Sequence, residues 1–182
     1  VSDTVAENAL HAFSKYGDNA PIVALENVYG DNVLSRAETL KDAIIETRGK
    51  ITKGLVEKGK DKKQARRIAE KLVGATWDVG HINMLRKQGY GEKEIIKQAN
   101  IIAPYTKHIH ISDNFGYTDA HLPPGMGSSP IKEQLKELDK FAEDATHVVE
   151  AGAYAGQFKD NPVPYTLENL DTPLYSHGQS PN

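Results

Sequence analysis

The sequence predicts an α/β protein that forms about half of a parallel (β/α) barrel of the TIM type. Helical and strand-like patterns alternate along the chain, no Asn-Gly or similar signal joins two strands into a hairpin, and each of the four strand-like runs ends in an acidic residue or a histidine. Barrels carry their functional side chains at the carboxyl ends of their strands. A complete barrel needs about 250 residues in eight units, so this chain is expected to be a fragment or to need a partner that closes it.

Composition limits the classes of protein to consider. The chain has 182 residues, 38% of them hydrophobic, and a formal charge of −3, so nucleic acid is not the first partner to expect, although a local basic patch can exist within an acidic total. Cysteine is absent, which excludes disulfides and thiolate chemistry and leaves His, Asp and Glu as metal ligands. No apolar run approaches the roughly 20 residues needed to span a bilayer, so a cytoplasmic protein without a membrane partner is expected.

The first elements follow from the spacing of apolar residues. Positions 2–16 have helical periodicity, with Ser2 and Asp3 as cap candidates and Gly17 at the end. The run 21–28 is short, β-branched and nearly continuous in apolar residues, which predicts a strand buried on both faces with Glu26 near its carboxyl end.

The remaining elements alternate in the same way. Helices are expected at about 35–57, 65–73, 95–102 and from Pro130, the last with a buried stripe of Ile131, Leu135, Leu138 and Phe141. Strands are expected at 74–81, 108–113 and 146–150. The segment 114–129 is a loop rich in Gly and Pro, and the chain is expected to be loop-like from Ala151 onward.

These elements predict one half-barrel domain over residues 1–160, which includes a helical insertion at 33–73, and an irregular tail over residues 161–182. A lid and an oligomer contact are alternative roles for the insertion. The tail is assigned no chemistry.

Alternation along the strands places the ionisable groups on one face. His108 and His110 point to the barrel interior, whereas Ile109 and Ile111 point toward the covering helices. Burying several ionisable side chains costs several kcal/mol each unless they are paired or bound to a cation. A divalent metal is the simplest way to offset that cost.

Each residue taken alone has a simpler interpretation. A single Glu at a strand end is more often a surface or ion-pair residue, and His108 could be a satisfied core histidine. The others, His11, His147 and His177, are expected to be solvated, structural or part of the tail. The joint order favours a metal site: a Glu at one strand end, Asp-x-x-His at the next, His-x-x-Asp at the third, Asp-x-His in the following loop and a Glu at the fourth.

This series of motifs resembles the xylose isomerase-like barrel superfamily, which comprises sugar isomerases, ketose 3-epimerases and abasic-site endonucleases of the endonuclease IV type. The resemblance covers about residues 21–150, and its combined motifs are specific. The motifs are Leu25-Glu-Asn-Val28, Trp77-Asp-Val-Gly-His81, His108-Ile-His-Ile-Ser-Asp-Asn114, Asp119-Ala-His-Leu-Pro-Pro-Gly-Met-Gly127 and Val149-Glu150.

The resemblance to the sugar epimerases implies one divalent ion, such as manganese, magnesium, cobalt or zinc, and a small sugar or sugar phosphate as substrate. The implied metal ligands are Glu26, Asp78, His110 and Glu150. The two glutamates would also act as the catalytic acid-base pair that removes and returns a proton beside a carbonyl. The resemblance implies that His81 binds substrate oxygens, and His121 and His108 are further candidate substrate-binding residues.

The resemblance to the endonucleases implies a different reaction, zinc-dependent cleavage of abasic DNA. In that case Asp119 and His121 would be additional metal ligands, and nucleic acid would be a partner. Ala120 stands where the endonucleases often have arginine, and the histidines that their earlier strands supply are absent from this chain. A third alternative is a metal-binding barrel fragment without catalysis, and a homo-oligomer is a further way to complete the barrel.

Overall fold

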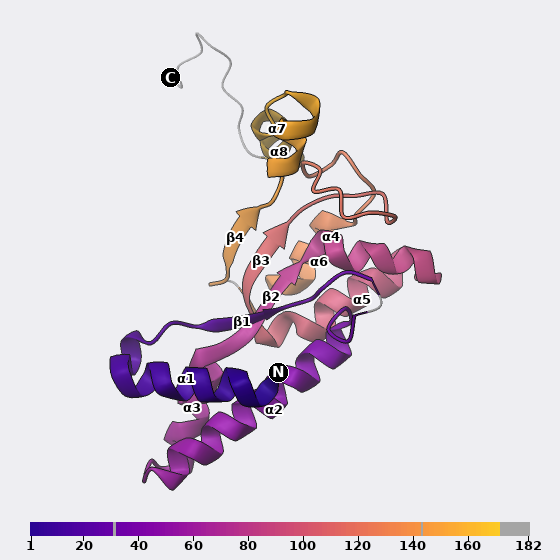
Figure 1. The fold of residues 1–182 in the computed structure, drawn as a ribbon. Coiled ribbons are helices and arrows are strands. Elements are labelled where there is room, and N and C mark those ends of the chain that lie inside the picture. Colours follow the sequence, from indigo (N-terminus) through magenta and orange to yellow (C-terminus); the bar gives the residue numbers. More distant parts are fainter. Residues whose placement is uncertain (31, 143, 172–182) are drawn as a thin grey trace.

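The computed structural model describes residues 1–30, 32–142 and 144–171 and contains one parallel sheet (Figure 1). Its four strands lie side by side in chain order, each paired in parallel with the next. The strands are β1 (Val23–Glu26), β2 (Val73–Asp78), β3 (Thr106–Ile111) and β4 (Thr146–Val149). The predicted α/β class and parallel topology are therefore confirmed.

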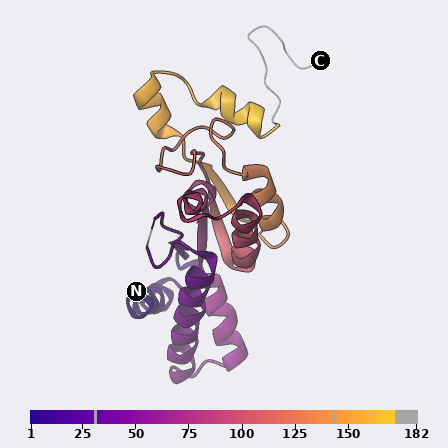
Figure 2. The same cartoon turned by 90° about the vertical axis from the view of Figure 1, so that its right-hand side faces the viewer.

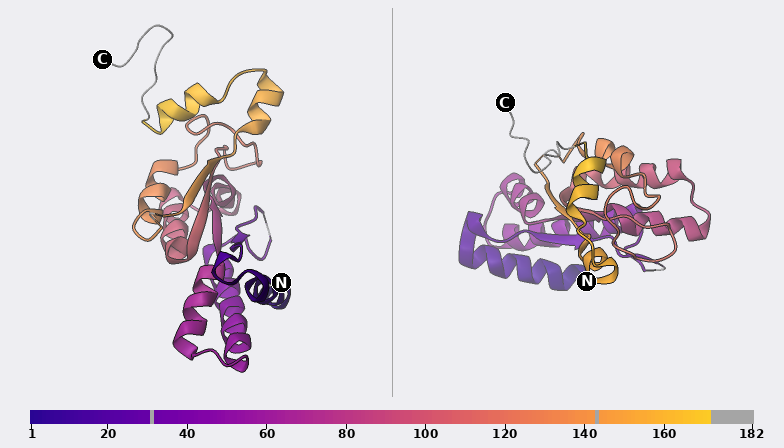
Figure 3. Two further views of the ribbon diagram at one scale, coloured as in Figure 1. Left: turned by 90° about the vertical axis from the view of Figure 1, so that its left-hand side faces the viewer. Right: turned by 90° about the horizontal axis from the view of Figure 1, so that it is seen from above.

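Helices precede, connect and follow the strands. They are α1 (Ser2–Tyr16), α2 (Ala37–Glu57), α3 (Lys62–Leu72), α4 (Val79–Asn83), α5 (Glu92–Ile102), α6 (Ile131–Leu138), α7 (Gly152–Phe158) and α8 (Val163–Asn169), with short 3-10 turns at Gly17–Asn19, Met84–Gln88 and Ala103–Tyr105. Figures 2 and 3 place the α2–α3 hairpin and the α7–α8 pair at opposite ends of the molecule. None of the described helices is long and apolar enough to cross a membrane.

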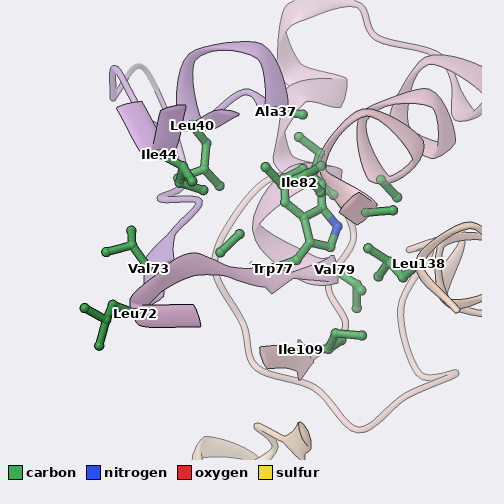
Figure 4. Packing of buried hydrophobic residues seen from close by; sticks show 14 of the residues in the cluster. Ala37, Leu40, Ile44, Leu72, Val73, Trp77, Val79, Ile82, Ile109 and Leu138 are labelled. Atoms are coloured by element: carbon green, nitrogen blue, oxygen red, sulfur yellow. The ribbon is translucent and has the colours of Figure 1, made fainter. Parts of the chain in front are cut away.

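One face of the sheet packs against helices and forms the core (Figure 4). Trp77 of β2 and Ile109 of β3 are fully buried there, between residues such as Leu40 of α2 and Leu138 of α6. The Trp77 indole nitrogen donates a hydrogen bond to Gln134 Oε1 at 3.1 Å, so the one polar atom of this ring is satisfied. Ile109 and Ile111 thus face the helices, as predicted from strand alternation.

The opposite face of the sheet stays accessible, which corrects the prediction that the first strand is buried on both faces. Every residue of β1 is only partly buried, and every residue of β4 is exposed. The described helices that pack on the sheet cover the face that carries Trp77, and on the interior face the accessible residues are those of β1, β3 and β4, because β2 is buried throughout. The histidines His108 and His110 lie on this open face, with ring centroids 4.7 Å apart.

Three local predictions were wrong. The expected loop after Ala151 contains two helices, α7 and α8, and residues 172–182, including His177, lie outside the described part of the chain. The strand expected at 74–81 ends at Asp78, because the Asp78 side chain caps α4 by accepting hydrogen bonds from two backbone N–H groups. Phe141 is 62% exposed rather than part of a buried stripe, because α6 ends at Leu138.

Two adjacent isoleucines of α2 allow a matched test of the core. Ile44 is fully buried, whereas Ile45 is 47% exposed. We expect Ile44→Val to lower the free energy of unfolding by about 1 kcal/mol, because it removes a buried methylene group, and Ile45→Val to change it by less than about 0.5 kcal/mol. Urea denaturation of the two variants measures both values, and equal losses would contradict the packing of α2.

Candidate metal centre

The carboxyl ends of the strands bring four predicted ligands together. Glu26 ends β1, Asp78 ends β2, His110 lies in β3, and Glu150 follows β4 with its backbone N–H bonded to the Ile111 carbonyl. His110 Nδ1 lies 3.1 Å from Glu26 Oε1 and 3.2 Å from Glu150 Oε1. Glu26, Asp78 and His110 offer ligand atoms that all lie within 4.8 Å of one another. The parallel register therefore gathers groups that are up to 124 positions apart, from Glu26 to Glu150.

Asp78 shows that this cluster fits a cation. Its side chain is fully buried, and its Oδ1 accepts hydrogen bonds from the backbone N–H groups of Gly80 and His81 and from the Ser112 hydroxyl, at 2.7, 2.9 and 3.0 Å. Its Oδ2 is buried and has no hydrogen-bond partner. A buried carboxylate oxygen without a donor is costly, and a metal ion beside Glu26 and His110 would satisfy it.

Asn27 positions Asp78 and was not singled out from the sequence. The Asn27 amide donates to the Asp78 carbonyl at 2.9 Å, and its Oδ1 accepts from the Asp78 N–H at 2.6 Å. This pair of hydrogen bonds joins the ends of β1 and β2 and thereby fixes Glu26 beside Asp78. In the sequence, the only indication of this role is that an amide residue directly follows Glu26 at the end of the strand. An asparagine at such a position could equally be an ordinary surface residue.

Gly80 is required where α4 begins. A Cβ atom at this position would collide with the Ser112 hydroxyl oxygen and lie 3.1 Å from the Ser112 carbonyl oxygen. The absence of a side chain thus lets the first turn of α4 approach the end of β3. This approach is what allows Ser112 to reach Asp78.

A second group of candidate ligands lies beside the first. Ligand atoms of His81, Asp119 and His121 all lie within 4.8 Å of one another. His81 Nδ1 lies 2.8 Å from the Asn27 carbonyl oxygen, which assigns the proton to Nδ1 and leaves the lone pair on Nε2, 3.3 Å from Asp119 Oδ2. His81 Nε2 is also 3.8 Å from Asp78 Oδ2, so the two groups adjoin.

Asp119 and His121 also retain unsatisfied buried atoms. Asp119 Oδ1 and His121 Nε2 are 3.0 Å apart, yet their orientation makes no hydrogen bond, and both atoms are buried without a partner. The backbone of His121 has a φ of 44°, a left-handed conformation that is unfavourable for a residue with a side chain. The loop therefore holds His121 in a strained conformation that points its imidazole toward Asp119.

Asp113 organises this loop and was likewise not predicted as a site residue. The side chain is 1% exposed, and its two oxygens accept hydrogen bonds from four backbone N–H groups. The donors are Asn114, Gly125, Gly127 and Ser129, at 2.8–3.0 Å. A single carboxylate thus folds residues 114–129 back over the end of β3.

His108 lies beside the first group without a ligand contact of its own. Its pKa is below the ordinary value, because burial disfavours the charged form and neighbouring His110 adds like-charge repulsion. His108 is therefore a neutral imidazole on the open face, able to accept or donate one hydrogen bond.

The charged and polar groups around His81 raise the pKa of its imidazole, and this effect can be measured. Burial alone would lower its pKa, but Asp78, the Asn27 carbonyl and Asp119 outweigh that effect and raise the pKa above 6.5. This interaction therefore stabilises the metal-free fold below about pH 6.5, and the contribution is lost as the pH rises through the folded-state pKa.

We expect the imidazole signals of His81, followed by NMR in metal-free protein, to titrate with a midpoint above 6.5, and Asp119→Asn to lower that midpoint. Zinc should abolish the titration, because the cation competes with the proton for the same lone pair. A midpoint below 6.5 in the unmodified protein would contradict the described arrangement.

Comparison with known proteins agrees with this fold. The chain is similar to the crystal structure of a D-tagatose 3-epimerase-like protein, with a TM-score of 0.51 and 19% identity, over 93% of this chain and 58% of that chain. It is 31% identical over 83 residues to an uncharacterized protein of Methanocaldococcus jannaschii, a match that covers 46% of this chain and 27% of that protein. The chain thus spans about half or less of the length of these two proteins.

The family comparison covers most of the chain. The model of the xylose isomerase-like TIM barrel family matches residues 3–172, a range that includes all four strand ends and the loop that carries Asp119 and His121. The resemblance that the sequence motifs indicated is confirmed over this whole range. The chain therefore belongs to the xylose isomerase-like TIM barrel family.

Proposed function

We propose that the protein is a metal-dependent isomerase or epimerase that moves a proton next to the carbonyl of a small sugar or sugar phosphate. The observation that carries the proposal is a pair of glutamates at the candidate metal centre: Glu26 and Glu150 both lie against His110 Nδ1, at 3.1 and 3.2 Å. Membership of a family named for a sugar isomerase supports the same class of reaction.

The donor set suits a divalent ion such as Mn, Mg, Co or Zn, because it combines carboxylate oxygens with one imidazole. Glu26, Asp78, His110 and Glu150 would hold the ion. When bound, such an ion polarises a substrate carbonyl and stabilises the negative charge that develops on its oxygen.

The two glutamates divide the proton transfer between them. One carboxylate takes the proton from the carbon next to the carbonyl, and the other, protonated, returns a proton to the reacting centre. Both side chains reach the open face of the sheet, with exposed fractions of 37% for Glu26 and 30% for Glu150, so a small substrate can approach them. The imidazoles of His81, His121 and His108 would bind substrate hydroxyl oxygens.

Deuterium uptake from heavy water tests this proposal. A panel of ketoses, aldoses and their phosphates is incubated with the full-length protein and manganese or zinc, and proton NMR follows the exchange. We expect exchange in at least one substrate and its loss in Glu150→Gln, with Glu133→Gln on α6 as a control that keeps activity. If metal binds but no sugar of the panel exchanges, the proposal fails.

A second candidate function, cleavage of abasic DNA, is favoured by the group of His81, Asp119 and His121. Together with the first group it offers ligands for more than one zinc ion, as a phosphodiester hydrolase would use. The test is nicking of an abasic duplex by the zinc-loaded protein. Nicking that Asp119→Asn abolishes, without deuterium uptake into sugars, would select this candidate over the first.

A further inference from the structure

Positive charge is concentrated in one segment of this acidic chain. Residues 48–71 contain ten Lys and Arg against three Asp and Glu, a formal charge of +7, so the rest of the chain carries −10 of the total of −3. The segment comprises the end of α2, the connecting turn and α3. A field of this kind is a local property that the net charge of the protein conceals.

Helix α3 is amphipathic, with one apolar face and one basic face. Ala65, Ala69 and Leu72 are buried against the rest of the fold. The outward side chains form two rows. Within each row, successive residues are four positions apart, which separates them by about 6 Å along the helix axis at a rise of about 1.5 Å per residue. One row is Lys63, Arg67 and Lys71, and the other is Lys62, Arg66 and Glu70.

Most of these charges have no acidic partner. Lys58, Lys62, Lys63, Arg66 and Arg67 are exposed and form no salt bridge with any residue that the structure describes. By contrast, Lys50, Lys53 and Lys71 in the same segment pair with carboxylates. The fold therefore leaves five exposed positive side chains without a carboxylate partner on α3 and on the turn before it, with Arg67 on the side of α1 and Arg66 on the side of α2.

The surface is hollowed along the side of α3 that faces α1. A cavity of about 500 Å³ is lined there by Phe13, Asp18, Lys60, Arg67, Ile68 and Lys71, among others. Only one of these named residues is acidic. Arg67 and Lys71 of the first row thus border this groove together with Lys60, and Lys63 lies one turn before Arg67 on the same helix.

From these observations we propose that the basic face of α3 binds the phosphate backbone of nucleic acid. Protein interfaces depend on a buried core of apolar and aromatic residues that is depleted in charge, whereas the outward rows of α3 hold no apolar residue. Unpaired Lys and Arg at regular spacing are what a polyanion with repeating charges requires, and they bind it without reading base sequence.

This site is separate from the candidate metal centre. The α2–α3 turn projects beyond the amino ends of the strands, whereas Glu26, Asp78 and Glu150 lie at their carboxyl ends (Figure 1). Nucleic acid on α3 would therefore be a tether or regulator and not the group that reacts at the metal. The proposal stands independently of the reaction proposed above.

The test is fluorescence anisotropy of the full-length protein with labelled 20-nucleotide DNA and RNA, single- and double-stranded, from 50 to 300 mM salt. Each phosphate contact contributes a slope of about −0.9 for a duplex in a plot of log affinity against log salt. We expect a slope of about −3 to −4, and K63E/R67E to weaken binding at least tenfold at 50 mM salt and to flatten the slope. The matched control K93E/K97E places the same charge change at the same spacing on the exposed side of α5.

The outcomes separate the possible partners. Weaker binding in K63E/R67E but not in K93E/K97E, with both variants folded by circular dichroism, supports the α3 site. If the two double variants weakened binding equally, binding would depend on the overall charge of the protein and not on α3, and the proposal would be overturned. Binding to phosphatidylserine vesicles that exceeds binding to every oligonucleotide would overturn it in favour of a membrane surface. Deuterium uptake into sugars should be the same in K63E/R67E as in the unmodified protein, so failure here is distinguishable from failure of the proposed reaction.

Discussion

Asp78→Asn is expected to weaken manganese or zinc binding at least 100-fold and to remove activity, while making the metal-free protein more stable. The substitution keeps an oxygen in place of Oδ1, which caps α4 and accepts from Ser112. It replaces Oδ2, a buried oxygen without a hydrogen-bond partner, by an amide group without charge. The variant thus isolates the contribution of one ligand atom with little change in shape.

The two effects have opposite signs for one physical reason. Without metal, the buried charge on the Asp78 carboxylate opposes folding, and replacing it by an uncharged amide should add about 1–3 kcal/mol to the free energy of unfolding. With metal, the same oxygen is a ligand, and binding to the folded state stabilises it by mass action. A chelator should therefore lower the melting temperature of the unmodified protein and leave that of Asp78→Asn unchanged.

Isothermal titration calorimetry with manganese and thermal melts with and without chelator measure both parts. Asp42→Asn, an exposed position on α2, removes the same charge away from the site and should change neither quantity. A metal-free Asp78→Asn protein that is less stable than the unmodified chain would contradict the interpretation of Oδ2 as an unsatisfied atom. Unchanged manganese affinity would exclude Asp78 as a ligand.

The pattern at the strand ends was sufficient to predict which side chains would meet. Parallel strands place their carboxyl ends at one edge of the sheet, and alternation along each strand decides the face. These two rules predict that Glu26, Asp78, His110 and Glu150 lie on one face at one edge of the sheet, and the structure gathers them around His110. Parity can be determined from each strand alone, and the parallel direction follows from the alternation of helices and strands along the chain.

Features that depend on distant segments could not be predicted in this way. Asn27 and Asp113 act through hydrogen bonds to backbone groups of other segments, and neither residue type nor spacing reveals which groups those will be. The accessibility of β1 and β4 depends on what covers the sheet, and an apolar run cannot report that. Helices α7 and α8 lie among Gly and Pro residues, which are typical of loops.

The basic surface illustrates the same limit. Overall charge pointed away from nucleic acid, because the negative remainder of the chain masks the +7 of residues 48–71. Helical spacing predicts that Lys63 and Arg67 share a face, but only the packing of Ala65 and Ala69 shows that this face is turned outward. Electrostatic properties of a surface therefore need the fold as well as the composition.

Asp113→Asn is expected to release the loop of residues 114–129 while leaving the sheet folded. Each oxygen of Asp113 accepts hydrogen bonds from two backbone N–H groups. Asparagine keeps only one of these oxygens, and its NH2 group is a donor, so two of the four backbone N–H groups lose their acceptor. Hydrogen bonds to a charged partner contribute about 1.5–3 kcal/mol each, and loss of two would cost about 3–6 kcal/mol locally. His121 has a strained φ and lies within this loop, so it should relax when the loop opens, and the group of His81, Asp119 and His121 should come apart.

Hydrogen exchange followed by mass spectrometry distinguishes this local opening from general unfolding. Peptides from the loop should exchange at least 100-fold faster in Asp113→Asn, whereas those of β2 and β3 should keep their protection, because local and global opening have separate free energies. Asp119→Asn is the control within the same loop, since its carboxylate accepts no backbone hydrogen bond in the described structure.

Metal binding by Asp113→Asn then separates the two ligand groups. Since Glu26, Asp78, His110 and Glu150 lie outside the loop, they should still bind one equivalent of manganese. Any further equivalent of zinc held by Asp119 and His121 should be lost. If the loop kept its protection, the four hydrogen bonds of Asp113 would not be what folds it, and if the first equivalent were lost too, the two ligand groups would form one site rather than two.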